Sequence, residues 1–349
     1  MEIREVEEAL LQNGALQVHI DHFWRQWILR KAPTARTPRL PFSVQAAAQK
    51  YKEELNKLAE VVEECSSPSD GTRLVLKLHD GQLIESVILP RGGVCVSTQV
   101  GCAVGCVFCM TGKFGLIRQL SDLEILAQVE IARRYQVIKK VVFMGMGEPS
   151  HNLRRVLSSI NFLAKYSGIS YKNLVLSTVG DRRLFDAIMA SKVKPALALS
   201  LHSTFDEKRK QLMPNIQPMP VADMMAFAAE YAKAGGYPVQ FQWTLIDGVN
   251  DGDEEVENVI SLWKGQKAIL NMIPVNKIAG SPYERPSDEA MLSIAERLKK
   301  GCVLLKYRHS AAQEVEGGCG QLRARKWKNL PNELNVGTSR HSLKVLRSK

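Results

Sequence analysis

Three closely spaced cysteines are the residues of this 349-residue chain best suited to chemistry. Cys102, Cys106 and Cys109 follow a C-x3-C-x2-C spacing, so their thiolates can surround one inorganic centre. Thiolates select zinc, Cu(I) or iron–sulfur clusters over hard cations. A structural zinc or an ordinary cluster takes a fourth protein ligand, and the next candidate along the chain is His151. The spacing favours a 4Fe-4S cluster with one iron open to a small molecule. The alternatives are a zinc knuckle or three unrelated buried thiols.

A second group of residues stands where apolar strands are expected to end. The segment Met-Gly-Met-Gly-Glu-Pro at 144–149 can expose backbone groups and offer the Glu148 carboxylate to an ammonium group. Considered without the cysteine loop, the same motif would be interpreted as a tight turn. In barrels of strands and helices, functional side chains collect at the carboxyl ends of strands. The candidate binding residues at these ends are Gly147, Glu148, Ser177, Ser200, Leu201, His202 and Asn276. Considered by itself, His202 could equally be a histidine of the hydrophobic core whose ring nitrogens are hydrogen-bonded.

Two further cysteines have unusual surroundings. Cys95 lies seven residues before Cys102, at the end of a short apolar stretch. Cys319 lies in Gly-Gly-Cys-Gly, where glycines leave the thiol sterically open, although such a cysteine is more often structural than catalytic. Cys65 and Cys302 lack such surroundings, and we expect them to be buried or incidental.

The elements that must position these residues alternate between strand and helix after Cys95. Alternation of this kind predicts parallel strands with right-handed crossovers, in an α/β fold that forms a partial, open (β/α)6 barrel. Ser121 and Glu124 predict a capping box at the start of the first helix. The expected strands are 140–144, 173–177, 196–201, 239–246, 268–274 and 303–307. The expected helices are 121–135, 153–165, 182–190, 221–234, 253–263 and 288–300.

The first part of the chain has a different pattern. Residues 1–60 appear helical by periodicity, with stretches at 3–11 and 46–62 separated by prolines 33, 38 and 41. Residues 73–78 and 83–89 alternate around a His-Asp-Gly turn, which predicts a hairpin. We therefore expect an N-terminal helical accessory region over 1–70, a hairpin lead-in over 71–94, a core barrel over 95–322 and a basic tail over 323–349.

Charge and cysteine usage limit the class of protein. The net charge of +11 gathers at 22–52, with seven Lys or Arg and no acid, and at 323–349, with eight Lys or Arg and one acid. Such basic ends fit a phosphate-binding surface or merely solubilise the chain. Trp24, Trp27 and Trp327 could stack on bases, although core packing is the stronger expectation for Trp24 and Trp27. The absence of an apolar signal or span predicts a cytoplasmic protein without membrane contact, whose cysteines are reduced.

The chain resembles the RlmN/Cfr family of radical S-adenosylmethionine (SAM) RNA methyltransferases from about residue 84 to residue 322. The order and spacing of several motifs agree throughout. They are Glu-Ser-Val-Ile-Leu-Pro at 85–90, Cys-Val-Ser-Thr-Gln-Val-Gly-Cys at 95–102, Gly-Met-Gly-Glu-Pro at 145–149, Leu-Ser-Thr at 176–178, Ser-Leu-His at 200–202, Asp-Gly-Val-Asn-Asp at 247–251, Asn-Met-Ile-Pro-Val-Asn at 271–276 and Cys-Gly-Gln-Leu at 319–322.

The resemblance implies an enzyme that methylates C2 or C8 of an adenine in ribosomal or transfer RNA. It implies a 4Fe-4S cluster on Cys102, Cys106 and Cys109, and two SAM molecules per turnover. Cys319 would carry an S-methylcysteine intermediate, Glu85 would accept the ring proton, and Cys95 would form a transient disulfide with Cys319. An attacking thiolate must be available, so we expect Cys95 to be accessible. An external reductant is implied, and a monomer is favoured.

The chain also departs from the family pattern. The first fifty or so residues do not resemble the usual accessory domain, and residues 311–318 lack an arginine and an aspartate that commonly precede the last cysteine motif. One alternative is therefore an enzyme of the same scaffold that acts on another nucleotide or a small molecule. The other is an RNA-binding protein with a redox-sensing cluster, which the retention of Cys95, Glu148 and Cys319 disfavours.

Overall fold

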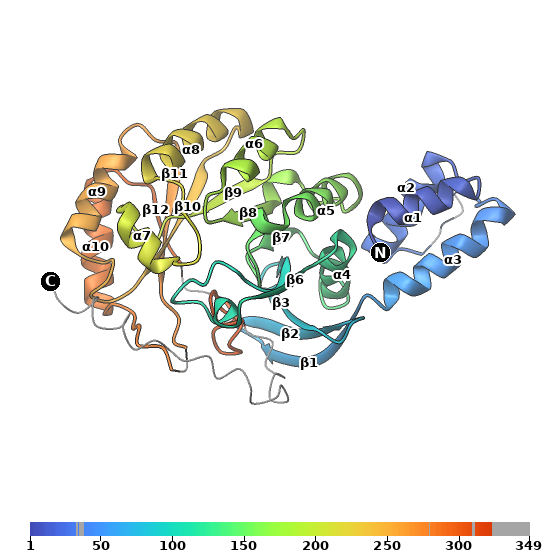
Figure 1. Cartoon of the computed structure of the whole chain (residues 1–349), viewed down its shortest axis with the longest axis horizontal. Helices are drawn as coiled ribbons and strands as arrows, with labels where there is room; N and C mark the ends of the chain where they lie inside the picture. Colours follow the sequence, from blue (N-terminus) through green and yellow to red (C-terminus); the bar gives the residue numbers. More distant parts are fainter. Residues whose placement is uncertain (33, 35–37, 279, 309–310, 323–349) are drawn as a thin grey trace.

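A computed structural model describes residues 1–32, 34, 38–278, 280–308 and 311–322, and its centre is one mixed sheet. The strand order is β1-β2-β3-β4-β7-β8-β9-β10-β11-β12, and all pairs from β4 onward are parallel. The sheet curves without closing, so β1 and β12 are its two edges (Figure 1). The α/β fold and the open, partial barrel predicted from the alternation are confirmed.

The parallel strands are short, buried and apolar, as strands covered on both faces must be. Four expected elements agree to the residue at both ends, namely β11 and helices α6, α9 and α10, and most others agree within three residues. The strands are β4 (Gly93–Cys95), β7 (Lys140–Phe143), β8 (Leu174–Thr178), β9 (Ala196–Ser200), β10 (Val239–Leu245), β11 (Ala268–Pro274) and β12 (Leu305–Tyr307).

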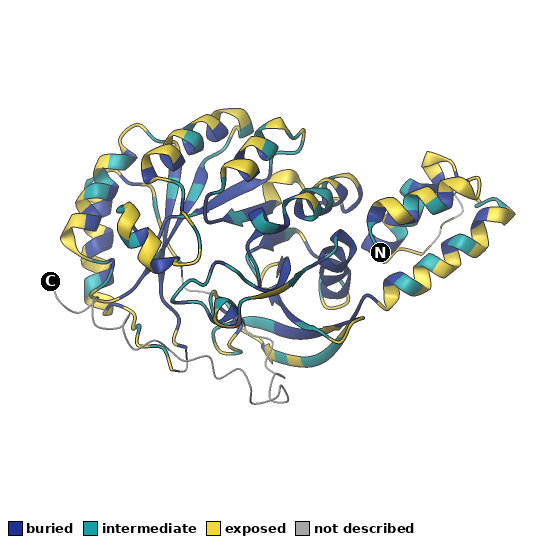
Figure 2. Ribbon diagram, viewed as in Figure 1, coloured by how far each residue is buried: buried dark blue, intermediate teal, exposed yellow. Residues whose placement is uncertain are grey.

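Helices cover the outer face of the parallel strands, with their polar sides turned to solvent (Figure 2). Ser121 and Glu124 form the expected capping box: each backbone N–H donates to the other side chain, over 2.8 and 3.1 Å. The helices are α4 (Asp122–Ala132), α5 (Leu153–Tyr166), α6 (Arg182–Ala190), α7 (Asp206–Leu212), α8 (Val221–Gly235), α9 (Asp253–Trp263) and α10 (Asp288–Lys300), with 3-10 turns η1 (Met110–Phe114), η2 (Pro149–Asn152) and η3 (Tyr171–Asn173).

Three antiparallel strands extend the sheet before the first parallel strand. They are β1 (Ala59–Ser67), β2 (Gly71–Leu78) and β3 (Leu83–Leu89), and β2 and β3 form the expected hairpin. The prediction of helix over 46–62 is wrong beyond Asn56, because residues 59–67 pair with β2 as strand β1. Helical periodicity continued into this segment, but the edge of β2 offers it a ladder of hydrogen bonds that only the tertiary structure provides.

The N-terminal helices explain the composition of α4. Every residue of α4 is buried, and its sequence is apolar nearly all round, as a helix covered on two sides requires. Helices α1 (Ile3–Gln12), α2 (Gln17–Leu29) and α3 (Phe42–Asn56) supply its second cover beside α5 (Figure 1). Trp24 and Trp27 pack edge-on against Phe162 of α5, so the expectation of core packing is confirmed for both. Trp327 and the basic tail lie outside the described residues.

Among the described residues, no helix combines the length and the apolar character that crossing a membrane requires.

Candidate active site

The loop that carries the three cysteines is closed at its base by a small hairpin. Strands β5 (Gln99–Gly101) and β6 (Leu116–Gln119) pair antiparallel on either side of it. Gly101 has a φ of 78°, and a Cβ there would lie 2.1 Å from the Gly115 carbonyl oxygen, so only glycine fits. The Cys102 N–H then donates to that oxygen over 2.9 Å. The hairpin thereby fixes where the cysteine loop leaves the sheet.

A cavity of about 160 Å³ lies between this loop and the carboxyl ends of the parallel strands. All three clustered cysteines line it, together with residues from the ends of β7, β8, β9 and β10. The polar or glycine residues that line it are Gly145, Gly147, Glu148, Ser177, Ser200, His202, Gln242, Thr244 and Thr111. Cys319 and Gly320 close one side. Segments far apart in sequence therefore meet at the edge where function is expected in such folds.

Glu148 is the most tightly held acid of the cavity. Its carboxylate accepts from Thr178 Oγ1 at 2.6 Å, from the Ser150 N–H at 3.0 Å and from the Val179 N–H at 3.2 Å. Its own N–H donates to Gln99 Oε1 at 2.7 Å. Burial raises the pKa of the Glu148 carboxyl despite these donors. A bound cation would favour its ionised form.

His202 has a strained but well-supported backbone at the end of β9. Its φ is 57°, in the left-handed region, and the Asn250 side-chain amide holds its carbonyl over 2.5 Å. The Thr244 N–H donates to His202 Nδ1 over 3.2 Å, which assigns the imidazole proton to Nε2. Burial, and secondarily the charge of Arg209, lowers the pKa of His202 to about 3. A neutral imidazole donor therefore faces the cavity.

A buried arginine that the sequence analysis missed ties the strand ends together. Arg209 of α7 donates to the carbonyls of Leu201 at 3.1 Å, Val179 at 3.0 Å and Ser200 at 3.3 Å. Burial lowers the pKa of Arg209 to about 10. The guanidinium satisfies carbonyls that parallel strands leave unpaired where they end. An arginine in a run of charged residues gave no sequence signal of this role.

The segment around Cys319 is anchored onto the cysteine loop. Gly320 accepts a hydrogen bond from the Met110 N–H at 2.7 Å, and a Cβ on Gly320 would lie 2.9 Å from the Phe108 oxygen. Thr111 Oγ1 donates to the Leu322 carbonyl at 2.7 Å. Asn276 Nδ2 donates to the Cys319 carbonyl at 2.8 Å. These bonds place an exposed thiol at the mouth of the cavity.

Cys95 lies beneath this segment, and the expectation that it is accessible is wrong. Its side chain is only 9% exposed, because β3, β7 and the segment before Cys319 cover the end of β4. Burial, and then the proximity of Cys319, raises the pKa of the Cys95 thiol well above its ordinary range. The two sulfurs are close enough to interact electrostatically. Cys302, expected to be buried or incidental, is exposed, and Cys65 is half-buried.

Glu85 lies on β3 and is fully buried, and it is not among the residues that line the cavity. Its carboxylate pairs with Arg73 of β2 over 2.9 Å. The same guanidinium donates to Glu63 at 3.0 Å, to Cys65 Sγ at 3.1 Å and to the Val315 carbonyl at 2.8 Å. Arg73 therefore connects Glu85 to the segment that ends at Cys319.

Comparison with known proteins decides the family to which this arrangement belongs. Residues 96–262 match the radical SAM superfamily. A protein of Methylibium petroleiphilum named "Probable RNA methyltransferase" is 50% identical over 328 residues, covering 93% of each chain. One of Pseudomonas paraeruginosa with the same description is 47% identical over 331 residues, covering 93% of this chain and 96% of its own. The chain belongs to the radical SAM RNA methyltransferase family.

A solved member of the radical SAM methyltransferases has the same architecture. The crystal structure of a radical SAM methyltransferase from Sphaerobacter thermophilus superposes with a TM-score of 0.81 at 30% identity, covering 93% of this chain and 98% of that one. The resemblance inferred from the motifs is thus confirmed, and the chain is a methyl-transferring radical SAM enzyme. The family uses a 4Fe-4S cluster together with SAM.

The donors in the cavity fit that cofactor pair better than a single metal ion. Among the described residues, no three His, Cys, Asp or Glu side chains converge closely enough to hold one ion. Three soft thiols nevertheless line one cavity, beside a carboxylate and a neutral histidine. Burial raises the pKa of Cys102 to about 12 and also raises that of Cys106, since each thiol is buried near the others. Such thiols ionise readily only against a strong positive charge.

The structure brings together most, but not all, of the residues expected to bind SAM. Gly147, Glu148, Ser177, Ser200 and His202 line the cavity. Leu201 is fully buried behind it, and Asn276 binds the Cys319 segment instead. Gln242 and Thr244 of β10 were missed, although their place at the end of an apolar strand was a usable signal.

Proposed function

We propose that this enzyme methylates a ring carbon, C2 or C8, of an adenine in ribosomal or transfer RNA. One observation carries the proposal: the exposed Cys319 lines the same cavity as the three clustered cysteines and lies close enough to the buried Cys95 for the two thiols to interact electrostatically. A cavity built only to bind SAM needs neither thiol. The family membership and the names of the relatives support RNA as the substrate.

The cavity residues would hold the cofactors. Cys102, Cys106 and Cys109 would bind three irons of the 4Fe-4S cluster and leave the fourth for SAM. Glu148 would receive the SAM ammonium group, with Gly147, Ser177, Ser200, Leu201 and His202 around the remainder, directly or through the backbone. When bound, the pair supplies a radical that can remove a hydrogen atom from a methyl group. Two SAM molecules would be used per turnover, one of them as the source of the methyl group on Cys319.

Cys319 would carry the one-carbon unit to the base. Cys319 is exposed, and the hydrogen bonds from Asn276 to its carbonyl and from Met110 to the Gly320 carbonyl hold its backbone, so a carbon attached to its sulfur can reach both the cavity and an RNA base outside. An adenine in a loop of RNA can be splayed out of its stack, which exposes its ring carbons. Glu85, aimed by Arg73, would accept the proton that leaves the ring carbon, and the one electron that the adduct must also lose would return to the cluster.

Cys95 would release the product. Its sulfur attacks the Cys319 sulfur, and the S–S bond forms as the bond between the Cys319 sulfur and the base-bound carbon breaks. That carbon keeps the electron pair and takes up a proton to become a methyl group. The two cysteines have then lost two electrons, and an external thiol reductant must restore them. Burial of Cys95 keeps other disulfides away from it, so its reaction partner is Cys319.

Anaerobic assay of the iron-loaded protein tests the proposal. The protein is incubated with SAM, a reductant and RNA from cells that lack its gene, and the nucleosides are analysed by mass spectrometry. We expect 2- or 8-methyladenosine from the wild type, none from Cys319→Ala, and RNA covalently attached to Cys319 in Cys95→Ala.

The two alternative functions predict different results in the same assay. Cleavage of SAM without methylated RNA would favour an enzyme that acts on another nucleotide or a small molecule. Absence of 5′-deoxyadenosine from an iron-loaded protein would favour a redox sensor. Methylation of RNA by Cys319→Ala would disprove the proposed role of that residue.

A further inference from the structure

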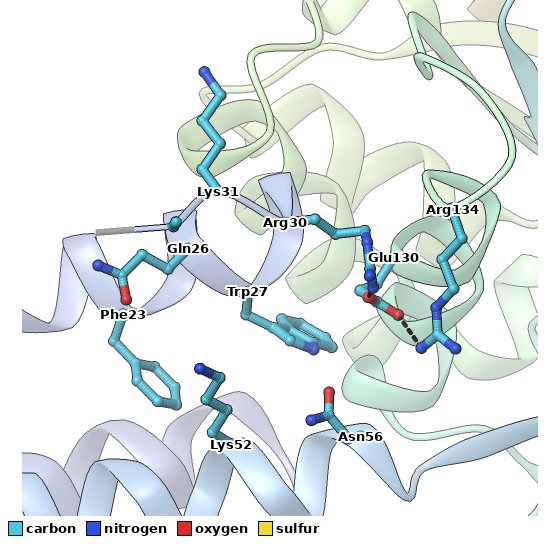
Figure 3. A pocket seen from close by; sticks show the side chains of 10 residues that line it. Phe23, Gln26, Trp27, Arg30, Lys31, Lys52, Asn56, Glu130 and Arg134 are labelled. Carbon is cyan, nitrogen blue, oxygen red and sulfur yellow. Dashed lines mark hydrogen bonds and ion pairs between the residues drawn. The ribbon is translucent and has the colours of Figure 1, made fainter. Parts of the chain in front are cut away.

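A second cavity, of about 560 Å³, lies apart from the cysteines, where α2 and α3 meet α4 (Figure 3). Its size falls within the range of about 300–1,000 Å³ that is typical of ligand sites. Residues of α2 and of the turn that follows it, from Phe23 to Lys31, form one wall. Lys52 and Asn56 of α3 form the second wall, and Glu130 and Arg134 form the third. The first wall belongs to the basic segment 22–52, to which no function has yet been assigned.

The charges of this cavity are strongly unbalanced. Arg30 and Arg134 both bind the single carboxylate, Glu130, the latter over 2.7 Å. Glu130 is almost fully buried, whereas both arginines keep about 40% of their side chains exposed: 44% and 41%. One acid therefore holds two guanidinium groups in place, and one positive charge remains uncompensated. The carboxylate pre-organises the arginines without neutralising them.

Two lysines add to this excess. Lys31 and Lys52 line the cavity and are exposed, and neither ammonium group has an ion-pair partner in the part of the chain that the structure describes. In Figure 3 the Lys52 side chain points into the space between Phe23 and Trp27, and the exposed Lys31 side chain points away from the other labelled residues. With four basic side chains and one acid, the lining has a formal charge of +3. Such a lining selects an anion.

The cavity is also rich in donors and offers an aromatic surface. Trp27 is 8% exposed, and its indole N–H is buried without a hydrogen-bond partner among the described residues. An acceptor brought by a ligand would satisfy this donor. Phe23 is half-buried at one end of the cavity. Basic side chains beside an aromatic ring are typical of sites that bind the backbone of single-stranded nucleic acid.

We infer that this cavity binds phosphodiester groups of the RNA substrate, away from the nucleotide that reacts. The inference rests on the proposed function and adds to it a second contact for the same RNA. The guanidinium groups of Arg30 and Arg134 and the ammonium groups of Lys31 and Lys52 bind phosphate oxygens, and a base stacks on Phe23. None of these residues lines the cavity of the cysteines, so the site contributes to RNA affinity and leaves the chemical step unchanged.

The double variant Lys31→Gln/Lys52→Gln tests the site without disturbing the Arg30–Glu130–Arg134 contacts. The matched control is Lys299→Gln/Lys300→Gln, which removes two exposed charges from α10 on the far side of the barrel (Figure 1). Binding of a mixed-sequence, adenine-containing RNA oligonucleotide to the iron-loaded protein is measured at several salt concentrations. Methylation of RNA from cells lacking the gene gives KM and kcat.

A plot of log affinity for RNA against log salt concentration has a negative slope. We expect this slope to be less steep, by about one to two, in the Lys31/Lys52 variant than in the wild type. Its KM for RNA should rise about 10-fold or more, while kcat and RNA-independent SAM cleavage stay at the wild-type values. Phe23→Ala should weaken RNA binding about 5-fold. The control variant should reproduce the wild type in each measurement.

Three results would overturn the inference, and the first two leave the proposed function intact. Wild-type salt slope and KM in the Lys31/Lys52 variant would show that RNA does not use the cavity, although methylation persists. A Lys52-dependent affinity for inorganic phosphate with unchanged RNA affinity would show a small-anion site. If the wild type neither binds nor methylates RNA, the proposed function and this inference both fail.

Discussion

Arg73 Nη1 donates to Glu85 Oε1 across 2.9 Å, and the two side chains are only 2% and 1% exposed. The same guanidinium holds the Val315 carbonyl, four residues before Cys319. Val315 belongs to the segment 311–318 that leads to Cys319. Arg73, contributed by β2, connects that segment to the sheet.

Replacement of Arg73 should destabilise the fold. Arg73→Met leaves the buried Glu85 without its guanidinium partner, which costs about 3–5 kcal/mol in the free energy of unfolding. Arg73→Met/Glu85→Met should recover most of that loss, because it removes both charges together. Denaturant titrations of the three proteins measure the effect. A single variant within 1 kcal/mol of the wild type would contradict the prediction.

The assignment of the cluster ligands can be checked by iron analysis. Cys109→Ala should lose the brown colour and most of the iron after anaerobic reconstitution, because two thiolates do not hold a 4Fe-4S cluster. Cys302→Ala is the matched control, since Cys302 is exposed and does not line the cavity. It should bind as much iron as the wild type. Equal iron in both variants would rule out Cys109 as a ligand.

The two cysteines proposed to react together should differ in reactivity. The thiolate is the nucleophile, so burial and a raised pKa keep Cys95 protonated and slow to alkylate at pH 8. We expect iodoacetamide to modify it at least about 10-fold more slowly than the exposed Cys302 and Cys319, as followed by peptide mass spectrometry. Comparable rates would mean that the segment before Cys319 opens freely.

His202 should make the fold sensitive to mild acid. Its pKa is lowered to about 3 in the folded protein, from about 6.5 when unfolded, so below pH 6.5 the unfolded chain binds a proton that the folded chain excludes. Stability should therefore fall as pH falls, by about 2 kcal/mol between pH 6.5 and 5. His202→Asn tolerates the left-handed backbone and still accepts from Thr244, and it should flatten this dependence. Identical pH profiles of the two proteins would refute the prediction.

Replacement of Asn276 should slow methyl transfer to RNA and leave iron binding unchanged. Asn276→Asp removes the amide that donates to the Cys319 carbonyl, and the loss of this hydrogen bond weakens the attachment of that segment by about 1 kcal/mol. We expect methylation to slow about 5- to 10-fold, while iron content and the KM for SAM stay unchanged. A raised KM for SAM would instead favour the direct SAM contact that the sequence analysis expected.

Local sequence determined much of the fold and part of the site. Periodicity and capping placed α9 and α10 to the residue, and alternation placed β11, because local conformational preference and burial agree there. The cysteine spacing and the strand-end residues Glu148 and His202 predicted one cavity, since parallel strands bring their carboxyl ends to a single edge.

The tertiary structure alone decided which long-range partners these residues meet. Residues 59–62 became strand because β2 offered an edge, and Cys95 became buried because β3 and the Cys319 segment cover it. Arg73 and Arg209 gave no local signal either. The basic run at 22–52 was visible in the sequence, but only folding brings it against α4 to form a cavity. The physical reason is common to all: conformational preference acts over a few neighbouring residues, whereas burial and charge pairing depend on segments that only folding brings together.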